Sequence, residues 1–233
     1  MKLEIPKWQV HRGYWKGGLR ENTLQSFIAA KRLGAKMVEL DVQLSRDKVS
    51  VVFHDWHLKK FFHVDALVEK TSWDDLRALN VASLEQVLRS EDVPEYLNIE
   101  IKSLDFYPFR AVKNVEQLIQ KYNKKKVVVS SFNPMALFAL RRLSPKTPRG
   151  LLIGRREVLM TWRMNWYLKL AKPQFLHIRH EFLEEDYLRN RVIECRLPVV
   201  VWTLNNLQKA KFYLERGAVS VISDELPPKD LES

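Results

Sequence analysis

The sequence has 233 residues, of which 46% are hydrophobic and 29% are charged, a balance that excludes a disordered chain and predicts a globular fold. Its single cysteine, Cys195, excludes an intramolecular disulfide. Because 39 Lys and Arg outnumber 28 Asp and Glu, the net charge is +11, which favours anionic partners such as a phosphate-bearing substrate, an acidic lipid surface or nucleic acid.

The N-terminal residues MKLEIPKWQV carry charges and a proline where a secretory signal would need an apolar run. No stretch approaches the roughly 18 apolar residues of a membrane-spanning helix. We therefore expect a cytoplasmic protein.

The chain begins with a short predicted strand at 8–12, a glycine-rich loop and a helix at about 24–33. Apolar residues at helical spacing and capping side chains at 21–23 favour this helix. His11 and Arg12 stand where the strand ends. By itself such a pair is better explained by a surface turn, so it gains weight only if other polar groups meet it.

Residues 37–55, MVELDVQLSRDKVSVVFHD, read as two strands joined by a polar turn. A turn centred near Asp47 would bring His54 opposite Asp41, and a slip of two residues would bring it opposite Glu39. In both registers Glu39, Asp41 and His54 share one face of the hairpin. Because buried carboxylates are costly unless they are paired or bind a metal, we favour a functional cluster over a solvated strand face.

A second charged pair lies in the predicted strand at 97–102, where two isoleucines face one way and Glu100 and Lys102 face the other. A strand that buries both faces is not expected to carry a charged pair unless the pair has a task. This strand is therefore the second indication of a site.

After residue 102 the chain alternates between helices and strands. Helices are expected at 108–121, 135–143, 155–172, 184–194 and 207–216, and strands at 127–131, 150–153, 175–178, 199–203 and 219–222. With 8–12, 37–43 and 97–102 these make eight strands, and 49–54 is an extra hairpin strand. Eight β–α units predict a TIM (β/α)8 barrel, formed by a single domain over 1–233 with a short insertion at about 56–96.

The polar residues of interest stand at the carboxyl ends of the predicted strands: His11, Glu39, Asp41, Glu100, Lys102, Ser131, Trp202 and Asp224. Barrels of this kind keep their active sites at that end. Convergence from several strands is harder to explain by chance than any one of these residues.

Residues 155–172 combine basic and aromatic side chains: Arg155, Arg156, Arg163, Lys169, Lys172, Trp162, Trp166 and Tyr167. Such a stretch is able to rest on an anionic membrane surface. The simpler interpretation, which we favour here, is an ordinary barrel helix whose aromatic side chains pack inward. We expect no nucleic-acid partner, because the basic residues are scattered and no recognition motif is present.

Six segments in order resemble the glycerophosphodiester phosphodiesterase family: HRG followed by ENT, ELDVQLSRDKVSVVFHD, NIEIK, SSFNPMALFALRRLSP, VVVWTLN and a closing ISD. The resemblance extends from His11 to Asp224. It implies a TIM barrel that uses a divalent cation to cleave glycerophosphodiesters into glycerol 3-phosphate and an alcohol. The chain departs from the family at Arg20, where a proline is usual, and at Lys48, where the hairpin turn usually has a glycine.

Carried over by motif, the resemblance implies roles for eight residues: His11 and His54 as catalytic histidines, Glu39, Asp41 and Glu100 as metal ligands, Arg12 and Lys102 as phosphate contacts, and Trp202 as a pocket wall. The chemistry of these residue types agrees. Three carboxylates without a thiolate suit Mg²⁺ or Ca²⁺ better than Zn²⁺. An unperturbed histidine pKa near 6.5 suits proton transfer.

We expect a small-molecule glycerophosphodiester as substrate, attacked at phosphorus by its own glycerol 2-hydroxyl. His54 is our choice for the general base and His11 for the general acid. An alternative is a lysophospholipase D-type enzyme that acts on lysolipids at a membrane surface with the same residues.

Overall fold

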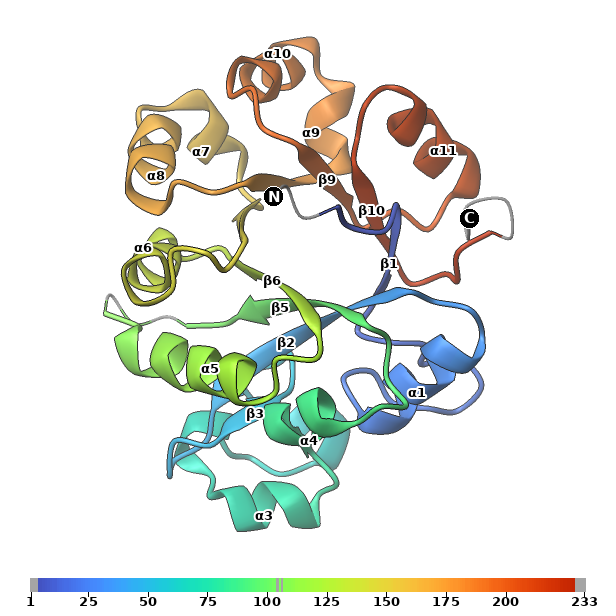
Figure 1. The fold of residues 1–233 in the computed structure, drawn as a ribbon, viewed down its shortest axis with the longest axis vertical. Coiled ribbons are helices and arrows are strands. Elements are labelled where there is room, and N and C mark those ends of the chain that lie inside the picture. Colours follow the sequence, from blue (N-terminus) through green and yellow to red (C-terminus); the bar gives the residue numbers. More distant parts are fainter. Residues whose placement is uncertain (1–3, 104, 106, 229–233) are drawn as a thin grey trace.

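The computed structural model describes residues 4–228 except 104 and 106. At its centre eight parallel strands close into a barrel (Figure 1). In ring order these are β1 (Trp8–His11), β2 (Met37–Leu44), β5 (Tyr96–Ile101), β6 (Lys126–Ser131), β7 (Arg149–Ile153), β8 (Phe175–Arg179), β9 (Val199–Trp202) and β10 (Ser220–Ser223). β1 pairs with both β2 and β10, which closes the ring. The predicted TIM barrel is confirmed.

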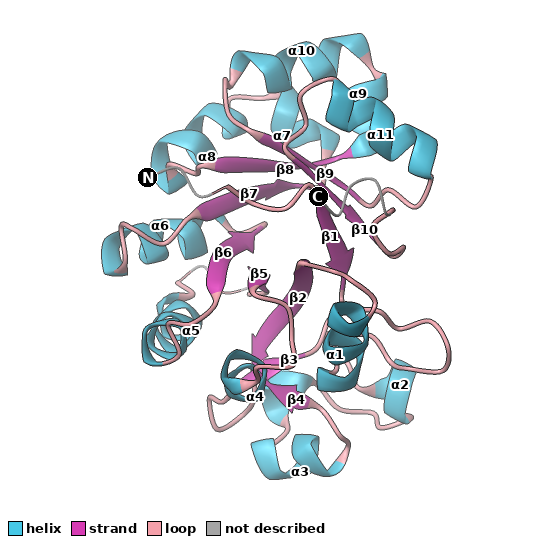
Figure 2. Cartoon of the chain, turned by 45° about the vertical axis from the view of Figure 1, so that its right-hand side comes forward, coloured by secondary structure: helices cyan, strands magenta, loops and turns pink. Residues whose placement is uncertain are grey.

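Helices surround the strands on the outside of the barrel (Figure 2). They are α1 (Leu24–Arg32), α5 (Phe109–Lys121), α6 (Pro134–Leu143), α7 (Arg156–Met160), α8 (Arg163–Ala171), α9 (His180–Glu184), α10 (Asp186–Glu194) and α11 (Leu207–Glu215). Within the described ranges, no helix has both the length and the apolar character needed to cross a bilayer.

An insertion between β2 and β5 adds elements outside the ring. They are β3 (Ser50–Val52), α2 (Lys59–Phe62), a 3₁₀ turn at Val68–Lys70, α3 (Trp73–Ala78), β4 (Ala82–Ser83) and α4 (Leu84–Arg89). The sequence predicted one extra strand, whereas the structure has two, because β4 pairs antiparallel with β3. The insertion has a small apolar core of its own around Phe53 and Leu58.

The predicted register of the hairpin is wrong by one residue. Val42 pairs with Val52, and the ladder ends there, so His54 lies opposite neither Asp41 nor Glu39. The cause is the turn, in which Ser45 faces Val49 across three residues and Lys48 takes a φ of 70°. A three-residue loop that ends in a left-handed residue shifts the pairing by one.

Residues 155–172 also differ from expectation. The single predicted helix is two, α7 and α8, because the backbone is extended at Thr161. The inward packing of the aromatic side chains is wrong for two of them, since Trp162 is 72% exposed and Trp166 is 42% exposed. Packing in the core therefore does not explain why this segment contains Trp162 and Trp166.

Inside the barrel, apolar residues including Met37, Val128 and Phe175 form a cluster of their own, apart from the main core between strands and helices. A polar network also lies buried in the interior. Asn98 Nδ2 donates to Gln9 Oε1 at 3.0 Å, and Gln9 Nε2 donates to Ser220 Oγ at 3.0 Å. Met37 precedes Glu39 on the inner face of β2, and Asn98 precedes Glu100 on that of β5, which leaves the carboxyl ends of the strands for the acidic groups.

Candidate active site

Three carboxylates converge at the carboxyl ends of neighbouring strands. Glu39 and Asp41 lie two residues apart on β2, and Glu100 on β5 is the register partner of Asp41. One oxygen from each of the three lies within 4.8 Å of the others. The alternation of the two strands aims all three side chains into the barrel, as predicted from the sequence.

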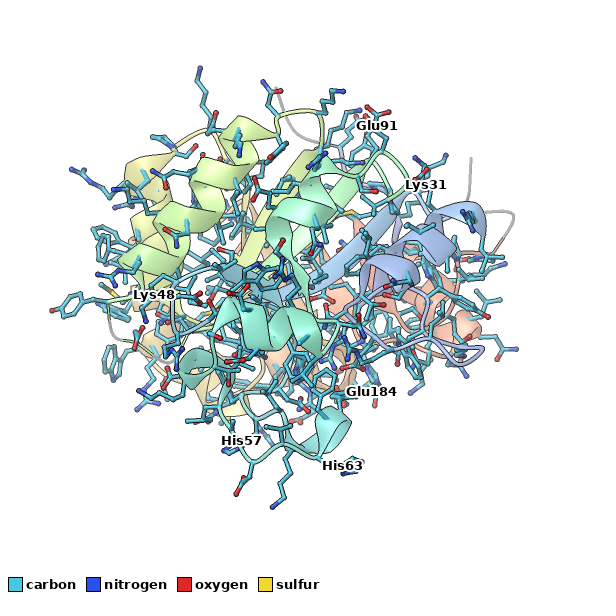
Figure 3. All side chains as sticks on the ribbon, turned by 90° about the horizontal axis from the view of Figure 1, so that it is seen from below. Lys31, Lys48, His57, His63, Glu91 and Glu184 are labelled. Atoms are coloured by element: carbon cyan, nitrogen blue, oxygen red, sulfur yellow. The ribbon has the colours of Figure 1, made fainter. Side chains whose placement is uncertain are left out.

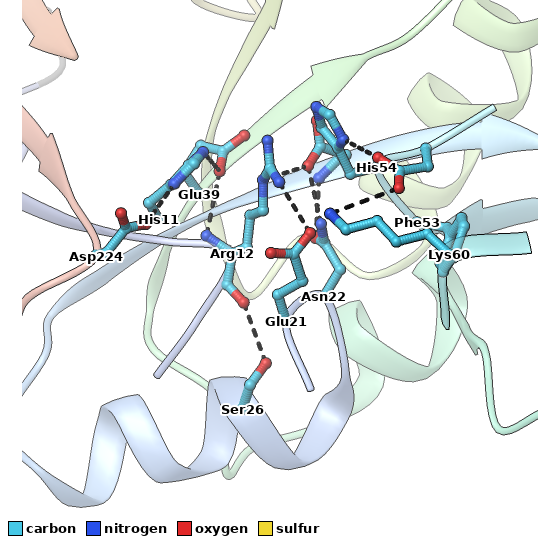
Figure 4. Close-up of polar contacts among 12 residues, drawn as sticks. His11, Arg12, Glu21, Asn22, Ser26, Glu39, Phe53, His54, Lys60 and Asp224 are labelled. Carbon is cyan, nitrogen blue, oxygen red and sulfur yellow. Dashed lines mark hydrogen bonds and ion pairs between the residues drawn. The ribbon is translucent and has the colours of Figure 1, made fainter. Parts of the chain in front are cut away.

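Arg12 joins this cluster through both its backbone and its side chain (Figure 4). Its N–H donates to Glu39 Oε2 at 3.2 Å, its Nη1 donates to Glu21 Oε1 at 2.8 Å, and its Nε lies 3.2 Å from Asp41 Oδ2. The loop that places it turns at Gly13, where φ is 77° and a Cβ would lie 2.5 Å from Ser26 Oγ. Only glycine fits there, so the HRG motif is a structural requirement of this loop.

Two further side chains hold Asp41. Lys102 Nζ lies 3.7 Å from Asp41 Oδ1 and 3.7 Å from Glu100 Oε1. Asn22 donates its amide to Asp41 Oδ2 at 2.8 Å and accepts from the Asp41 N–H at 3.1 Å. Sequence reasoning assigned Asn22 only to the capping of the helix that follows it and gave it no role in the site, although the ENT motif contains it.

The pKa values of the three acids are shifted in different directions by their surroundings. Burial, with repulsion from Asp41 and Glu100, raises the pKa of Glu39 well above its usual value. Burial, with repulsion from Asp41, raises the pKa of Glu100 to about 7. Burial acts in the same direction on Asp41, but the charges of Arg12 and Lys102 outweigh it and lower the pKa of that carboxyl.

The two predicted histidines lie on either side of the acids, and each has a carboxylate on its Nδ1. His11 Nδ1 lies 2.7 Å from Asp224 Oδ1, and its Nε2 lies 3.9 Å from Glu39 Oε2 (Figure 4). His54 Nδ1 lies 2.6 Å from Asp55 Oδ1. Burial lowers the pKa of His54, against the opposing charge of Asp41.

His54 reaches the cluster although the strand ladder has already ended. Gln43 Nε2 donates to the carbonyl oxygens of Phe53 at 2.8 Å, His54 at 3.2 Å and Asp55 at 2.8 Å. The Phe53 N–H also donates to the Asp41 carbonyl at 3.0 Å. The side chain of Gln43 therefore replaces the missing strand pairing, a role that no pattern in the sequence indicated.

These groups border a cavity of about 150 Å³ at the barrel mouth. Seven of the eight predicted residues line it, and the eighth, Asp41, binds Arg12 and Asn22 beside it. Phe132 also lines the cavity and packs edge-to-face on Trp202 with ring centroids 5.7 Å apart. A larger cavity of about 1070 Å³ includes Pro148, Gln174 and Pro198, which precede β7, β8 and β9, so it opens at the amino end of the barrel.

Histidines elsewhere do not join this site. His57 and His63 stand at the outer edge of the insertion (Figure 3), outside the cavity. His177 is fully buried within the barrel wall, against Gly150, and so does not line the rim.

A divalent cation fits the acidic cluster on its donor chemistry. The ligand atoms are all carboxylate oxygens, which Mg²⁺ and Ca²⁺ prefer. Burial, together with repulsion among the three acids, raises the pKa of Glu39 and Glu100, and a cation would offset that repulsion.

Comparison with known proteins gives a consistent result. The model of the glycerophosphoryl diester phosphodiesterase family matches residues 11–227. A glycerophosphodiester phosphodiesterase of Caldanaerobacter subterraneus subsp. tengcongensis is 28% identical over 93% of this chain and 93% of its own length.

Solved structures agree in fold. A glycerophosphodiester phosphodiesterase from Thermotoga maritima matches with a TM-score of 0.78 and 30% identity, covering 97% of each chain. An Oleispira antarctica phosphodiesterase in complex with the product sn-glycerol-3-phosphate matches with a TM-score of 0.81 and 26% identity, covering 95% of this chain and 94% of that one.

Proposed function

Because this chain belongs to the glycerophosphodiester phosphodiesterase family, we propose that it hydrolyses glycerophosphodiesters to glycerol 3-phosphate and an alcohol at the site described above. The observation that carries the proposal is the meeting of three carboxylates, two histidines and two cationic side chains around one small cavity. The Oleispira antarctica relative binds the same compound, sn-glycerol-3-phosphate, as its product.

Glu39, Asp41 and Glu100 would hold a Mg²⁺ or Ca²⁺ ion. When bound, such an ion stabilises negative charge that develops on phosphate oxygens in the transition state. Arg12 and Asn22 orient the Asp41 carboxylate, and Lys102 balances charge between Asp41 and Glu100.

Arg12 and Lys102 would also contact the substrate phosphate. The guanidinium group suits bidentate contact with phosphate oxygens, whereas the lysine supplies a compact charge. Lys102 Nζ stands 5.5 Å from the centroid of the Trp56 ring, so an aromatic face lies on its other side. Trp202 and Phe132 would form an apolar wall of the cavity.

Proton transfer is assigned to the two histidines. His54 takes the proton of the glycerol 2-hydroxyl as its oxygen bonds to phosphorus, and His11 protonates the alcohol oxygen as its bond to phosphorus breaks. Water then opens the cyclic phosphodiester, with the proton transfers reversed. The lowered pKa of His54 keeps its ring neutral and able to accept a proton near neutral pH.

The lysophospholipase D alternative is not favoured by the comparisons, because the named relatives are glycerophosphodiester phosphodiesterases. A substrate panel tests the proposal. Purified protein with Mg²⁺ or Ca²⁺ is expected to release glycerol 3-phosphate from glycerophosphocholine, glycerophosphoethanolamine or glycerophosphoglycerol, and faster than from the matching lysolipids. No release from any glycerophosphodiester with either ion would refute it.

A further inference from the structure

An exposed aromatic and basic face lies on α7 and α8, on the outside of the barrel. We call it the α7–α8 surface and define it by Met160, Trp162, Arg163, Trp166 and Lys169. Trp162 is 72% exposed, Met160 48% and Trp166 42%, and both basic residues are exposed. Large apolar side chains gathered in this way on a folded protein mark a contact with a partner or a membrane.

The positive charge of residues 155–172 favours an anionic partner. Residues 155–172 contain five basic residues and one acidic residue, a difference of 5 − 1 = +4. One of the five, Arg156, pairs with Glu185 at 2.8 Å. Tryptophan rings prefer the headgroup level of a bilayer, and basic residues are attracted to anionic lipid.

The surface begins at the same end of the barrel as the candidate active site, because α7 starts three residues after the carboxyl end of β7. It then runs along α8 toward the amino end, where the Ala171 carbonyl accepts from Arg149, the first residue of β7. Between β7 and α7, a Cβ on Gly154 would lie 2.7 Å from the ring of Phe132, which itself lines the cavity. The connection from β7 to α7 is therefore part of the rim, and a partner bound along the α7–α8 surface lies against the side of the barrel that leads to this rim.

We propose that the α7–α8 surface binds anionic phospholipid bilayers and so holds the protein at the membrane. The inference goes beyond the proposed function, because binding needs no turnover. It also places the enzyme in a reaction sequence. Glycerophosphodiesters arise when both acyl chains are removed from a phospholipid, so the reaction class that supplies the substrate is phospholipid deacylation at a bilayer.

Co-sedimentation with vesicles tests the proposal. The full chain is expected to bind vesicles of phosphatidylcholine mixed with phosphatidylglycerol at low salt and to be released as salt is added. It should bind pure phosphatidylcholine much more weakly. Absence of binding to the anionic vesicles at low salt would overturn the proposal.

Neutralising variants separate this surface from the general positive charge of the chain. R163Q/K169Q should lower the vesicle partition coefficient roughly 25-fold, since each basic residue near an anionic surface contributes about fivefold. The matched control R32Q/K36Q removes one exposed arginine at the end of α1 and one exposed lysine just before β2, away from α7 and α8, and should change binding by less than about twofold. Equal losses in the two variants would show that net charge alone is responsible.

Removing the aromatic rings tests the apolar contribution. W162S/W166S should lower the partition coefficient about tenfold or more. The control L33S/F212S, which alters two exposed apolar residues on other helices, should not. If wild type is instead a dimer by light scattering that W162S/W166S converts to a monomer, a second copy covers this face and the proposal is wrong.

Turnover of a water-soluble glycerophosphodiester is measured in parallel. All four surface variants should retain it, because none alters a residue of the cavity. Binding without any turnover in wild type would leave the membrane proposal standing and contradict the proposed function, whereas turnover without binding would do the reverse.

Discussion

The imidazole of His11 and the carboxylate of Asp224 form a hydrogen-bonded pair, with Nδ1 and Oδ1 2.7 Å apart. Asp224 also accepts from Asn205 Nδ2 at 2.7 Å, so the carboxylate is held from two sides. Burial would raise the pKa of Asp224, but its hydrogen bond and charge interaction with His11 lower it. Asp224 therefore stays ionised and accepts the hydrogen bond of His11 Nδ1, which leaves Nε2 of the ring directed toward Glu39 and available for proton transfer.

Replacing Asp224 with Asn should lower kcat by about 100-fold with little change in KM, because the neutral amide no longer holds the His11 ring as the carboxylate does. Steady-state kinetics and thermal unfolding of D224N give the two readouts, rate and fold. The control N205A removes a neighbour but keeps the carboxylate, so it should lose far less activity. D224N with an unchanged kcat would contradict the positioning role.

Replacing either histidine of the site should remove turnover. H11A and H54A are each expected to lose about 10²- to 10⁴-fold in kcat, the usual contribution of a general acid or base. Both should still gain thermal stability when the cation is added, since the three carboxylates remain. H57A, at the outer edge of the insertion, is the matched control. A near-normal rate in H11A or H54A rules out the assignment for that residue.

The sequence predicted the strand positions of this barrel closely, because buried parallel strands are continuous apolar runs interrupted only where polar residues have a task. β5 shows this well, since Glu100 stands out in Tyr96–Ile101. The side chains that orient the site were harder to predict. Gln43 and Asn22 act through side-chain hydrogen bonds to other segments of the chain, three for Gln43 and two for Asn22, and periodicity contains no information about such bonds.

The hairpin shows a different limit. Its strands and its acidic face were predicted, but the register depends on how many residues the turn contains, and the sequence SRDK allows more than one turn. The outward direction of Trp162 and Trp166 was missed for a related reason. One helix was assumed where two exist, so the aromatic residues were assigned to a single apolar face.

Replacing Glu100 or Asp41 with its neutral amide should change the stability of the protein in opposite directions. E100Q is expected to raise the melting temperature of the cation-free protein near neutral pH and above, because the raised pKa of Glu100 means that its charged form is disfavoured. D41N should destabilise it, but by less than the cost of a fully unpaired buried charge, which is about 3–5 kcal/mol. The reason is that Arg12 and Lys102 each lose one carboxylate partner and keep another, Glu21 and Glu100 respectively. Thermal unfolding in a chelator measures both. A loss of stability in E100Q would contradict this division of charge.

Stabilisation by a cation should grow with pH. Glu100 has its pKa raised from 4.5 to about 7, so over that range the cation-free folded protein binds more protons than the unfolded chain. The contribution of Glu100 to the free energy of unfolding is therefore complete below pH 4.5 and is lost as pH rises through about 7.

Cation binding requires ionised carboxylates and displaces these protons. The rise in melting temperature on adding Mg²⁺ or Ca²⁺ should thus be larger at about pH 8 than at about pH 5.5. Melting curves with and without the ion give the comparison directly. A rise of equal size at both values would mean that the raised pKa values do not describe this site.

His177 offers a test of stability apart from catalysis. Its ring is fully buried, neither nitrogen has a hydrogen-bond partner in the described part of the chain, and burial lowers its pKa from 6.5 to about 3. Its stabilising contribution is complete above pH 6.5 and is lost as pH falls toward about 3, because only the unfolded chain binds a proton in that range. H177L should raise the free energy of unfolding by about 1–3 kcal/mol at neutral pH, since it removes unpaired buried nitrogens.

The gain in H177L should be larger at about pH 5 than at about pH 8, because the acid-dependent loss disappears with the imidazole. Urea unfolding at both values measures it, and exposed H57L serves as the control. A variant that loses stability at both values would show that the imidazole has a partner or a packing role.

We propose that Glu39, Asp41 and Glu100 hold a divalent cation that turnover requires. The most direct measurement is the initial rate of glycerol 3-phosphate release by wild type and E100Q, first in EDTA and then during titration with Mg²⁺ or Ca²⁺. Wild type should be inactive in EDTA and regain its rate as the ion saturates, while E100Q should need far more ion or stay inactive. Full activity of wild type in EDTA, or the same titration curve for E100Q, would contradict the claim.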